Sequence, residues 1–114
     1  MSARQLKPRP KIDQTAPIFA ALGDETRLRL VARLCKDGPM SIARLTAGSS
    51  VTRQAVTKHL HVLASVGLAS SSPSGRERVW EFEPAPLDAA RQCLDRISEQ
   101  WDGALDRLKK FVED

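Results

Sequence analysis

Five side chains that can form strong hydrogen bonds lie close together near the middle of the chain: Arg53, Gln54, Thr57, Lys58 and His61. Successive residues of an α-helix are about 100° apart, so on a helix these side chains would share an arc of about 140°. The other side of that helix would carry mainly alanine, valine and leucine, together with His59. The pattern predicts an amphipathic helix with one packing face and one polar, positively charged face.

This polar face carries the functional groups that read base edges in double-stranded DNA. In the major groove, arginine and lysine can donate to guanine, glutamine can bond to adenine, and the threonine methyl group can contact thymine. Carboxylates, which phosphates repel, are absent from residues 38–76, although Arg44, Arg53, Lys58 and Arg76 lie there. A DNA duplex is therefore the predicted partner. The alternative is an ordinary solvated helix face with no ligand.

A second, shorter helix is expected just before the polar one. Ser41 is a suitable N-cap for it and Gly48 a suitable end, whereas Thr52 caps the polar helix, which runs to about Val66 and ends at Gly67. Two helices joined by so short a turn predict a helix-turn-helix, in which the start of the second helix contacts bases. The predicted DNA contacts of this helix are Thr52, Arg53, Gln54, Thr57 and Lys58, with His61 at the groove edge.

A β-hairpin is expected after the polar helix. Residues 68–71 and 79–83 predict two strands, and residues 72–75, Ser-Pro-Ser-Gly, have the composition of a turn. In the second strand the large side chains of Trp80 and Phe82 would share the inward face. Arg76 and Arg78 lie beside the turn, where exposed cations could contact phosphate or an adjacent minor groove. The alternative is a solvent-exposed turn that contacts nothing.

Two further helices are expected on the N-terminal side of the helix-turn-helix. Residues 1–14 contain four basic residues and two prolines, which predicts a flexible basic arm, and the domain is expected to span residues 15–112. Pro17 would start a short helix ending at Gly23. Asp24 would cap a helix over about 25–37. The expected inward stripe of that second helix is Leu28, Val31, Ala32 and Cys35.

The last helix, expected over about 87–112, has apolar residues at both of the positions that face a partner helix in a heptad repeat. Such a stripe is longer than a small domain needs for its own core, so we expect it to pack against a second copy as a two-fold dimer. The alternative is that the helix folds back on its own domain. The predicted dimer contacts are Leu87, Leu94, Ile97, Trp101, Leu105, Leu108 and Phe111.

The composition limits the class of protein. The chain has 114 residues, of which 41% are hydrophobic and only 4% aromatic, which favours a single, mainly helical domain. Residues 1–80 carry 13 basic and 5 acidic side chains, whereas residues 81–114 carry 5 and 9, so the two ends are expected to face different partners. No secretory signal or membrane-spanning run is visible, which predicts a soluble, cytoplasmic protein without a membrane partner.

Metal binding and catalysis find little support in the residues. His59 and His61 would point about 200° apart on a helix, so they cannot share one metal ion, and His59 is expected as a hydrogen-bonded core residue. Cys35 and Cys93 form neither a CxxC pair nor a disulfide framework, and we expect both to be reduced and packed. No nucleotide-binding or hydrolase motif appears, so neither an enzyme nor a cofactor is predicted.

Three stretches resemble the ArsR/SmtB family of winged-helix repressors: ALGDETRLRL at 21–30, RQAVTKHLHVL at 53–63 and GLA at 67–69, with Gly75-Arg76 following in the wing. The resemblance covers about residues 15–112. It implies a mainly helical fold with a small β-hairpin wing, dimerised through its terminal helices, that represses transcription from an operator in or near its own promoter. Arg53, Gln54, Thr57 and Lys58 match the reading-helix positions of that family.

The resemblance is to the metal-independent subgroup of the family. The metal sensors have a cysteine pair in the third helix, but residues 41–45 here are Ser-Ile-Ala-Arg-Leu, and the last helix contains no histidine. Two other functions remain open: a metal- or redox-responsive derepressor that uses Cys35 and Cys93, and a dimeric interaction module that does not read DNA. A small-molecule effector is not identified by any residue pattern.

Overall fold

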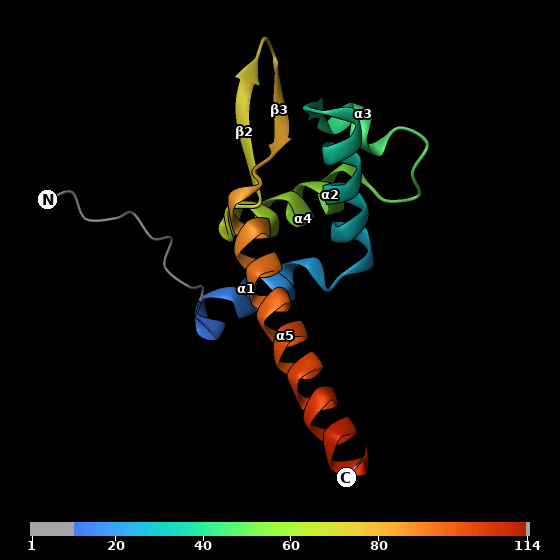
Figure 1. The fold of residues 1–114 in the computed structure, drawn as a ribbon. Coiled ribbons are helices and arrows are strands. Elements are labelled where there is room, and N and C mark those ends of the chain that lie inside the picture. The colour runs from blue at the N-terminus through green and yellow to red at the C-terminus, as the bar shows by residue number, and fades with distance from the viewer. Residues whose placement is uncertain (1–10, 114) are drawn as a thin grey trace, which may run out of the picture.

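The computed structural model describes residues 11–113 of the chain, and the arrangement of its helices and strands is shown in Figure 1. The expected class, mainly helical with a hairpin wing, is confirmed. In chain order the elements are α1 (Ile12–Leu22), α2 (Glu25–Asp37), β1 (Met40–Ser41), α3 (Ile42–Thr46), α4 (Arg53–Ser65), β2 (Ala69–Ser74), β3 (Glu77–Phe82) and α5 (Ala85–Glu113). None of the helices within residues 11–113 is long and apolar enough to cross a membrane.

Three helices begin at the capping residues that the sequence indicates. The Asp24 carboxylate accepts the backbone N–H of Arg27 at 3.0 Å, and the hydroxyls of Ser41 and Thr52 accept the corresponding N–H groups of their own helices at 3.3 and 3.1 Å. Each cap satisfies a donor that the first turn of a helix leaves unpaired. The predicted ends of α2 and α4 are also confirmed, because Gly38 and Gly67 have positive φ angles of 83° and 77°.

The wing is part of a three-stranded antiparallel sheet with the strand order β1-β3-β2. Ala69 pairs with Phe82 at its base and Ser74 with Glu77 near its tip, so the turn consists of Gly75 and Arg76 alone. The predicted four-residue turn at 72–75 is therefore wrong: the strands continue through serine and proline because residues 72–78 are exposed on an edge hairpin. The two-residue strand β1 was not predicted, since a run that short has no visible period.

The first helix begins five residues before Pro17, so its predicted start is wrong. The helix begins at Ile12, and Pro17 lies inside it. Thr15 is only 1% exposed, and its hydroxyl donates to the Lys11 carbonyl at 2.6 Å, which makes a polar residue part of the buried face. The last residues of the expected basic arm, 12–14, are thus helical, and residues 1–10 lie outside the described part of the chain.

The buried face of α2 also differs from the expected one. Leu30, Val31 and Leu34 are buried, whereas Leu28 is 53% exposed. Ala32 and Cys35 are exposed as well, so Cys35 is not a packed core residue. Apolar residues occur on two overlapping faces of this helix, and the face that is buried is the one that lies against α4 and β3.

A single hydrophobic core joins the helices to the sheet. The largest fully buried side chains are contributed by β1, α4 and the segment after α4: Met40, Val56, Leu60, Leu63 and Leu68. Trp80 of β3 is 3% exposed and packs on this core, as its place on the inward face predicts. The beginning of α5 packs against α1, while its C-terminal part extends away from the rest of the chain (Figure 1).

Candidate nucleic-acid interface

Helix α4 presents its polar face to solvent. Arg53, Gln54, Lys58 and His61 are exposed and Thr57 is half-buried, as the helical arc predicts. The Thr57 hydroxyl donates to the Arg53 carbonyl at 2.7 Å, which fixes the side chain. The helix carries no carboxylate, so nothing on it opposes the approach of a phosphate backbone.

The opposite side of α4 packs as expected, with one exception. Val56, Leu60 and Leu63 are buried, but Val62, which the pattern assigned to the packing face, is 40% exposed. It lies about 200° from Leu60 around the helix, so it cannot enter the same core.

The wing brings a second group of cations toward this helix. A hollow of about 270 Å³ lies between the start of α3, the start of α4 and β3, and Arg53, Thr57 and Arg78 line it together with Glu77. Arg78 donates to the Ser71 hydroxyl on the neighbouring strand at 3.1 and 3.2 Å, so its guanidinium is held across the hairpin. Arg76 occupies the exposed turn at the tip. Residues that are far apart in the sequence therefore form one surface.

The two histidines of α4 lie on different sides of the helix, as expected. The His61 ring meets the Trp80 ring edge to face, with centroids 5.5 Å apart and an interplanar angle of 87°. The His59 ring lies near Arg27 of α2 instead, with its Nδ1 atom 3.3 Å from a guanidinium nitrogen. Its side chain is one-quarter exposed, so His59 is half-buried and not the expected core residue. His61 thus links α4 to the wing, which the sequence pattern did not reveal.

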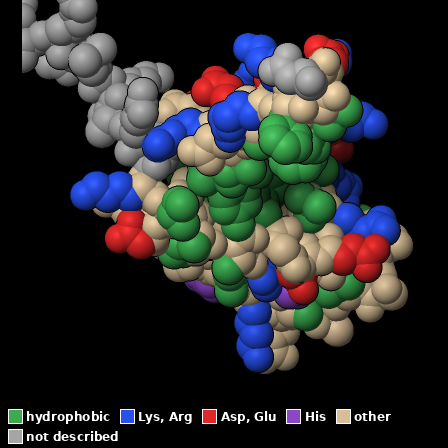
Figure 2. Space-filling view, turned by 60° about the horizontal axis from the view of Figure 1, so that its bottom comes forward, with side chains coloured by type: hydrophobic (Ala, Val, Ile, Leu, Met, Phe, Trp, Pro, Cys, Tyr) green, Lys and Arg blue, Asp and Glu red, His purple; other side chains and the backbone are tan. Residues whose placement is uncertain are grey.

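The surface of α5 is apolar over much of its exposed length. Leu94, Ile97, Leu105 and Leu108 are 43–58% exposed, and Trp101 is 62% exposed. Phe111 and Val112, near the end of the helix, are more exposed still. Figure 2 shows hydrophobic side chains gathered around a hollow on the face where α5 ends. Leu87 differs from the other predicted contacts of this helix because it packs against the core of its own domain.

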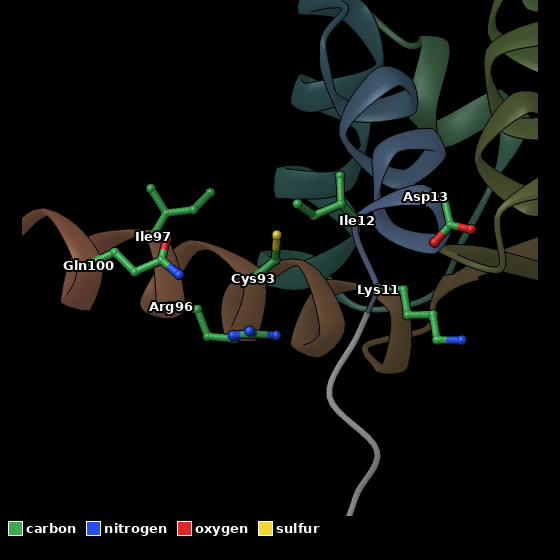
Figure 3. Close-up of a pocket in the computed structure, with 7 residues that line it drawn as sticks. All are labelled: Lys11, Ile12, Asp13, Cys93, Arg96, Ile97 and Gln100. Carbon is green, nitrogen blue, oxygen red and sulfur yellow. The ribbon is translucent and has the colours of Figure 1, made fainter.

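A hollow of about 510 Å³ continues this apolar surface between the start of α1 and the middle of α5. The side chains of Ile12, Cys93 and Ile97 point toward the same space from the two helices (Figure 3). Cys93 is buried, as expected. Within residues 11–113, no group of three or more His, Cys, Asp and Glu side chains is placed to hold a metal ion.

A helix-turn-helix followed by an antiparallel hairpin defines the winged helix-turn-helix class, and three comparisons identify the family. Residues 22–71 match a family described as a helix-turn-helix domain. The chain is 37% identical over 95 residues to the HTH-type transcriptional regulator Rv2034 of Mycobacterium tuberculosis. The aligned region covers 83% of this chain and 85% of the relative. The ArsR-like transcriptional regulator from Rhodococcus sp. RHA1 superposes with a TM-score of 0.79 at 36% identity, covering 89% of this chain and 92% of that one.

A more distant structure shares the fold. The homodimeric winged helix-turn-helix DNA-binding domain Mb0332 from Mycobacterium bovis superposes with a TM-score of 0.60 at 21% identity, covering 88% of this chain and 91% of that domain. The chain belongs to the ArsR family of winged helix-turn-helix transcriptional regulators, as the resemblance in its sequence implied. It is a DNA-binding regulator and not an enzyme.

Proposed function

We propose that this protein is a homodimeric, sequence-specific repressor that binds a pseudo-palindromic operator, including one in or near its own promoter. The observation that carries the proposal is the shared surface of α4 and the wing, where Arg53, Thr57 and Arg78 line one hollow. Glu77 also lines this hollow, but residues 38–76, which contain the rest of that surface apart from Arg78, include no carboxylate. Such a surface combines groups that read bases with groups that hold phosphates.

The side chains divide by their place on this surface. Arg53, Gln54, Thr57 and Lys58 lie in the first part of α4, from which a reading helix contacts base edges. The other predicted contacts lie at the cap of α4, farther along α4 and in the wing, and they are proposed to contact phosphates or the adjacent minor groove: Thr52, His61, Arg76 and Arg78. The Thr52 hydroxyl already caps α4, so a contact from this residue would use its remaining lone pair or its backbone.

The dimer is proposed to form through α5, with a contribution from α1. The exposed apolar side chains of α5 supply the contact, and the hollow beside Ile12 and Ile97 extends it to α1. The structurally similar domain from M. bovis is described as homodimeric. A two-fold dimer would place two reading helices about 34–36 Å apart, one turn of DNA, which suits a pseudo-palindromic site. A site of action in the cytoplasm, and repression rather than activation, remain parts of this proposal.

The test is a titration of the full chain against a fluorescent duplex from its own upstream region and against a scrambled duplex, by anisotropy at 50 and 200 mM salt. A preference of about 10³-fold or more for the native duplex, with affinity falling as salt rises, is the expected result. If the protein binds the two duplexes equally, the next experiment is to select bound sequences from a pool of random duplexes. Failure to select any sequence would overturn the proposal.

A further inference from the structure

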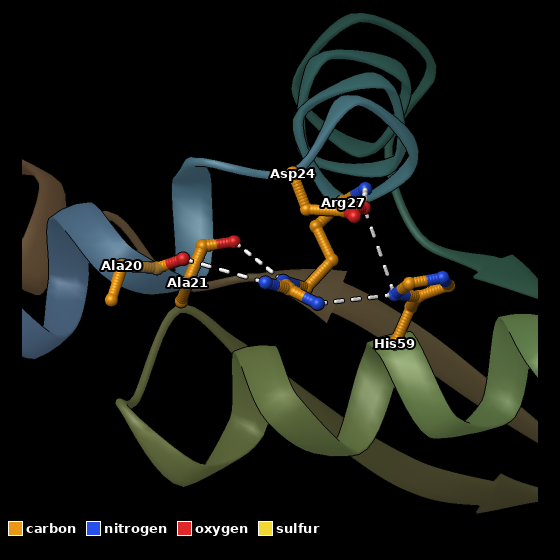
Figure 4. A network of polar contacts seen from close by, with 5 residues as sticks. All are labelled: Ala20, Ala21, Asp24, Arg27 and His59. Carbon is orange, nitrogen blue, oxygen red and sulfur yellow. Dashed lines mark hydrogen bonds and ion pairs between the residues drawn. The ribbon is translucent and has the colours of Figure 1, made fainter.

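Arg27 connects three helices at one polar junction (Figure 4). It belongs to the first turn of α2. Its guanidinium Nε donates to the Ala21 carbonyl at 2.6 Å and a terminal nitrogen lies 3.4 Å from the Ala20 carbonyl, both in the last turn of α1. The other terminal nitrogen lies 3.3 Å from Nδ1 of His59 in α4. One side chain thus contacts both the helix before it and the DNA-reading helix.

The position of Arg27 within α2 is electrostatically unfavourable unless its guanidinium interacts with negative charge outside α2. The first turn of a helix carries a partial positive charge, which disfavours a cation there. The last turn of α1 has the opposite partial charge, and it contains no basic residue of its own. The Arg27 guanidinium supplies the missing cation, pairs the Ala21 carbonyl at the end of α1, and adds a longer contact to the Ala20 carbonyl, which already accepts the backbone N–H of Gly23.

The other end of the junction has a defined hydrogen-bond direction. Arginine has no acceptor atom, so a hydrogen bond between these two side chains requires the Nδ1 atom of a neutral His59 ring to accept from Arg27, with the ring proton on Nε2. The Asp24 carboxylate holds the backbone of Arg27 at 3.0 Å and lies 3.8 Å from the same Nδ1 atom. The three charged or polar groups therefore fix one another from α2 and α4.

This contact differs in kind from the others that hold α4. The packing face of α4 is made of Val56, Leu60 and Leu63, whose apolar contacts have no preferred direction. Among the described residues, the bond between Arg27 and His59 is the only side-chain hydrogen bond that joins α4 to another helix. His59 lies on the side of α4 opposite the base-reading residues, so it can orient that helix without touching DNA.

We propose that Arg27 is a positioning residue that sets α4 relative to α1 through His59, and thereby sets the affinity for DNA. The inference rests on the proposed function, in which α5 and α1 form the dimer contact and α4 reads the operator. Because α1 packs against α5, the Arg27 junction connects the helices that would set the distance between the two reading helices to α4 itself. A misplacement of about 1 Å in a positioned contact is enough to weaken it strongly.

The test measures operator affinity for variants on both sides of the contact. Arg27→Met removes the donor, and His59→Leu removes the acceptor, whereas His59→Asn keeps an acceptor near the Nδ1 position. We expect Arg27→Met and His59→Leu each to weaken binding by about tenfold, the double variant to be no more than about twofold weaker than either, and His59→Asn to stay within about threefold of the unmodified chain. Arg29→Met is the matched control, because Arg29 bonds only the exposed Glu25 beside it.

A spectroscopic measurement separates positioning from general destabilisation. In the unmodified chain, the ¹⁵N shifts of the His59 ring should report an unprotonated Nδ1 that accepts a hydrogen bond, and Arg27→Met should move that Nδ1 resonance while circular dichroism shows a folded protein. Wild-type affinity in folded Arg27→Met, or losses that simply add in the double variant, would overturn the inference alone. If the unmodified chain selects no duplex, the proposed function fails and the inference fails with it.

Discussion

At the level of single residues, Arg53 is best placed to read a base. It is exposed, begins α4, and lines the hollow that α4 shares with the wing. We expect Arg53→Ala to weaken binding to the operator by about 1–3 kcal/mol and to relax the sequence preference at one base pair, because a guanidinium can engage guanine through two hydrogen bonds. Anisotropy titrations against operators with each base at that position would measure both effects.

The control for this substitution is Arg29→Ala, which removes an equal charge from α2, outside the proposed surface. It should leave affinity and sequence preference unchanged. An Arg53→Ala variant that binds every operator with the same modest loss would show that Arg53 holds a phosphate instead of a base.

Asp24 makes a second residue-level prediction, which concerns pH. The backbone N–H of Arg27 stabilises the charged form of this carboxyl and lowers its pKa below the ordinary value, although partial desolvation opposes the shift. The charge of Arg27, and that of the His59 ring when it is protonated, lower the pKa further by smaller amounts. A lowered pKa in the folded state means that the carboxylate stabilises the fold above its ordinary pKa, near 4, and that this contribution is lost as pH falls through the folded value.

The matching variant is Asp24→Asn, which keeps a side chain that can cap a helix but removes the charge. The difference in free energy of unfolding between the two proteins should be constant from pH 7 to about 5 and shrink as pH falls below about 4. Urea unfolding at several pH values measures it. A difference that stays the same at pH 3 would mean that the charge of Asp24 does not contribute.

The sequence could identify those residues whose role follows from their own type and their spacing along one helix, without knowledge of tertiary contacts. The polar face of α4 follows from helical spacing alone, and the structure exposes it as expected. Arg27 could not be found in this way, because its role depends on Ala21 and His59, which are brought beside it only by folding. Its one signal in the sequence is a cation in the first turn of a helix, where the helix dipole disfavours it.

Among the elements, the helices that have capping residues were predictable and those that depend on burial were not. The starts of α2, α3 and α4 follow from Asp24, Ser41 and Thr52. The start of α1 depends on a buried threonine, and the inward face of α2 depends on which of two apolar stripes meets α4. The start of α1 and the inward face of α2 are thus determined by tertiary packing, which the helix propensities of the residues do not encode.

The wing makes a prediction at the same scale. Its tip is a two-residue turn in which Arg76 follows Gly75, and the φ of Gly75 is 64°. If the tip contacts phosphate, Arg76→Ala should weaken all duplexes alike and reduce the slope of log affinity against log salt by about 1. Titrations at four or more salt concentrations measure the slope.

Arg76→Lys is the matched control, because it keeps the charge and should keep the slope. A wing that lies away from the duplex would leave the affinity and slope of Arg76→Ala unchanged. This separates a phosphate-binding wing from a merely solvated turn.

At the scale of the whole molecule, charge and apolar surface are separated along the chain. The acid-free interval at 38–76 contains α3, α4 and the tip of the wing, whereas the acidic excess falls in residues 81–114, which include α5. The apolar side chains exposed on α5 lie outside the core, and the C-terminal part of α5 extends away from the wing (Figure 1). A contact through α5 between two copies would bury this apolar area and keep its carboxylates away from phosphate.

The two cysteines lie in different environments, which bears on whether they could form a redox or metal switch. Cys93 is buried beside α1, and Cys35 is exposed on α2. Partial desolvation raises the pKa of the Cys35 thiol, which reduces the fraction of reactive thiolate at neutral pH. On the proposed function, operator binding should depend on the geometry of the dimer.

Substituting Trp101 tests that dependence. The side chain is 62% exposed, so Trp101→Glu removes little from the core of its own domain but places a carboxylate in the proposed contact. We expect a folded monomer by analytical ultracentrifugation, with about 100-fold weaker binding to the full operator and little change on an isolated half-site, because the two reading helices then bind independently. Lys109→Glu, an exposed charge reversal on the same helix, should remain a dimer. A Trp101→Glu protein that still sediments as a dimer would place the contact elsewhere, and the apolar face of α5 would then require another partner.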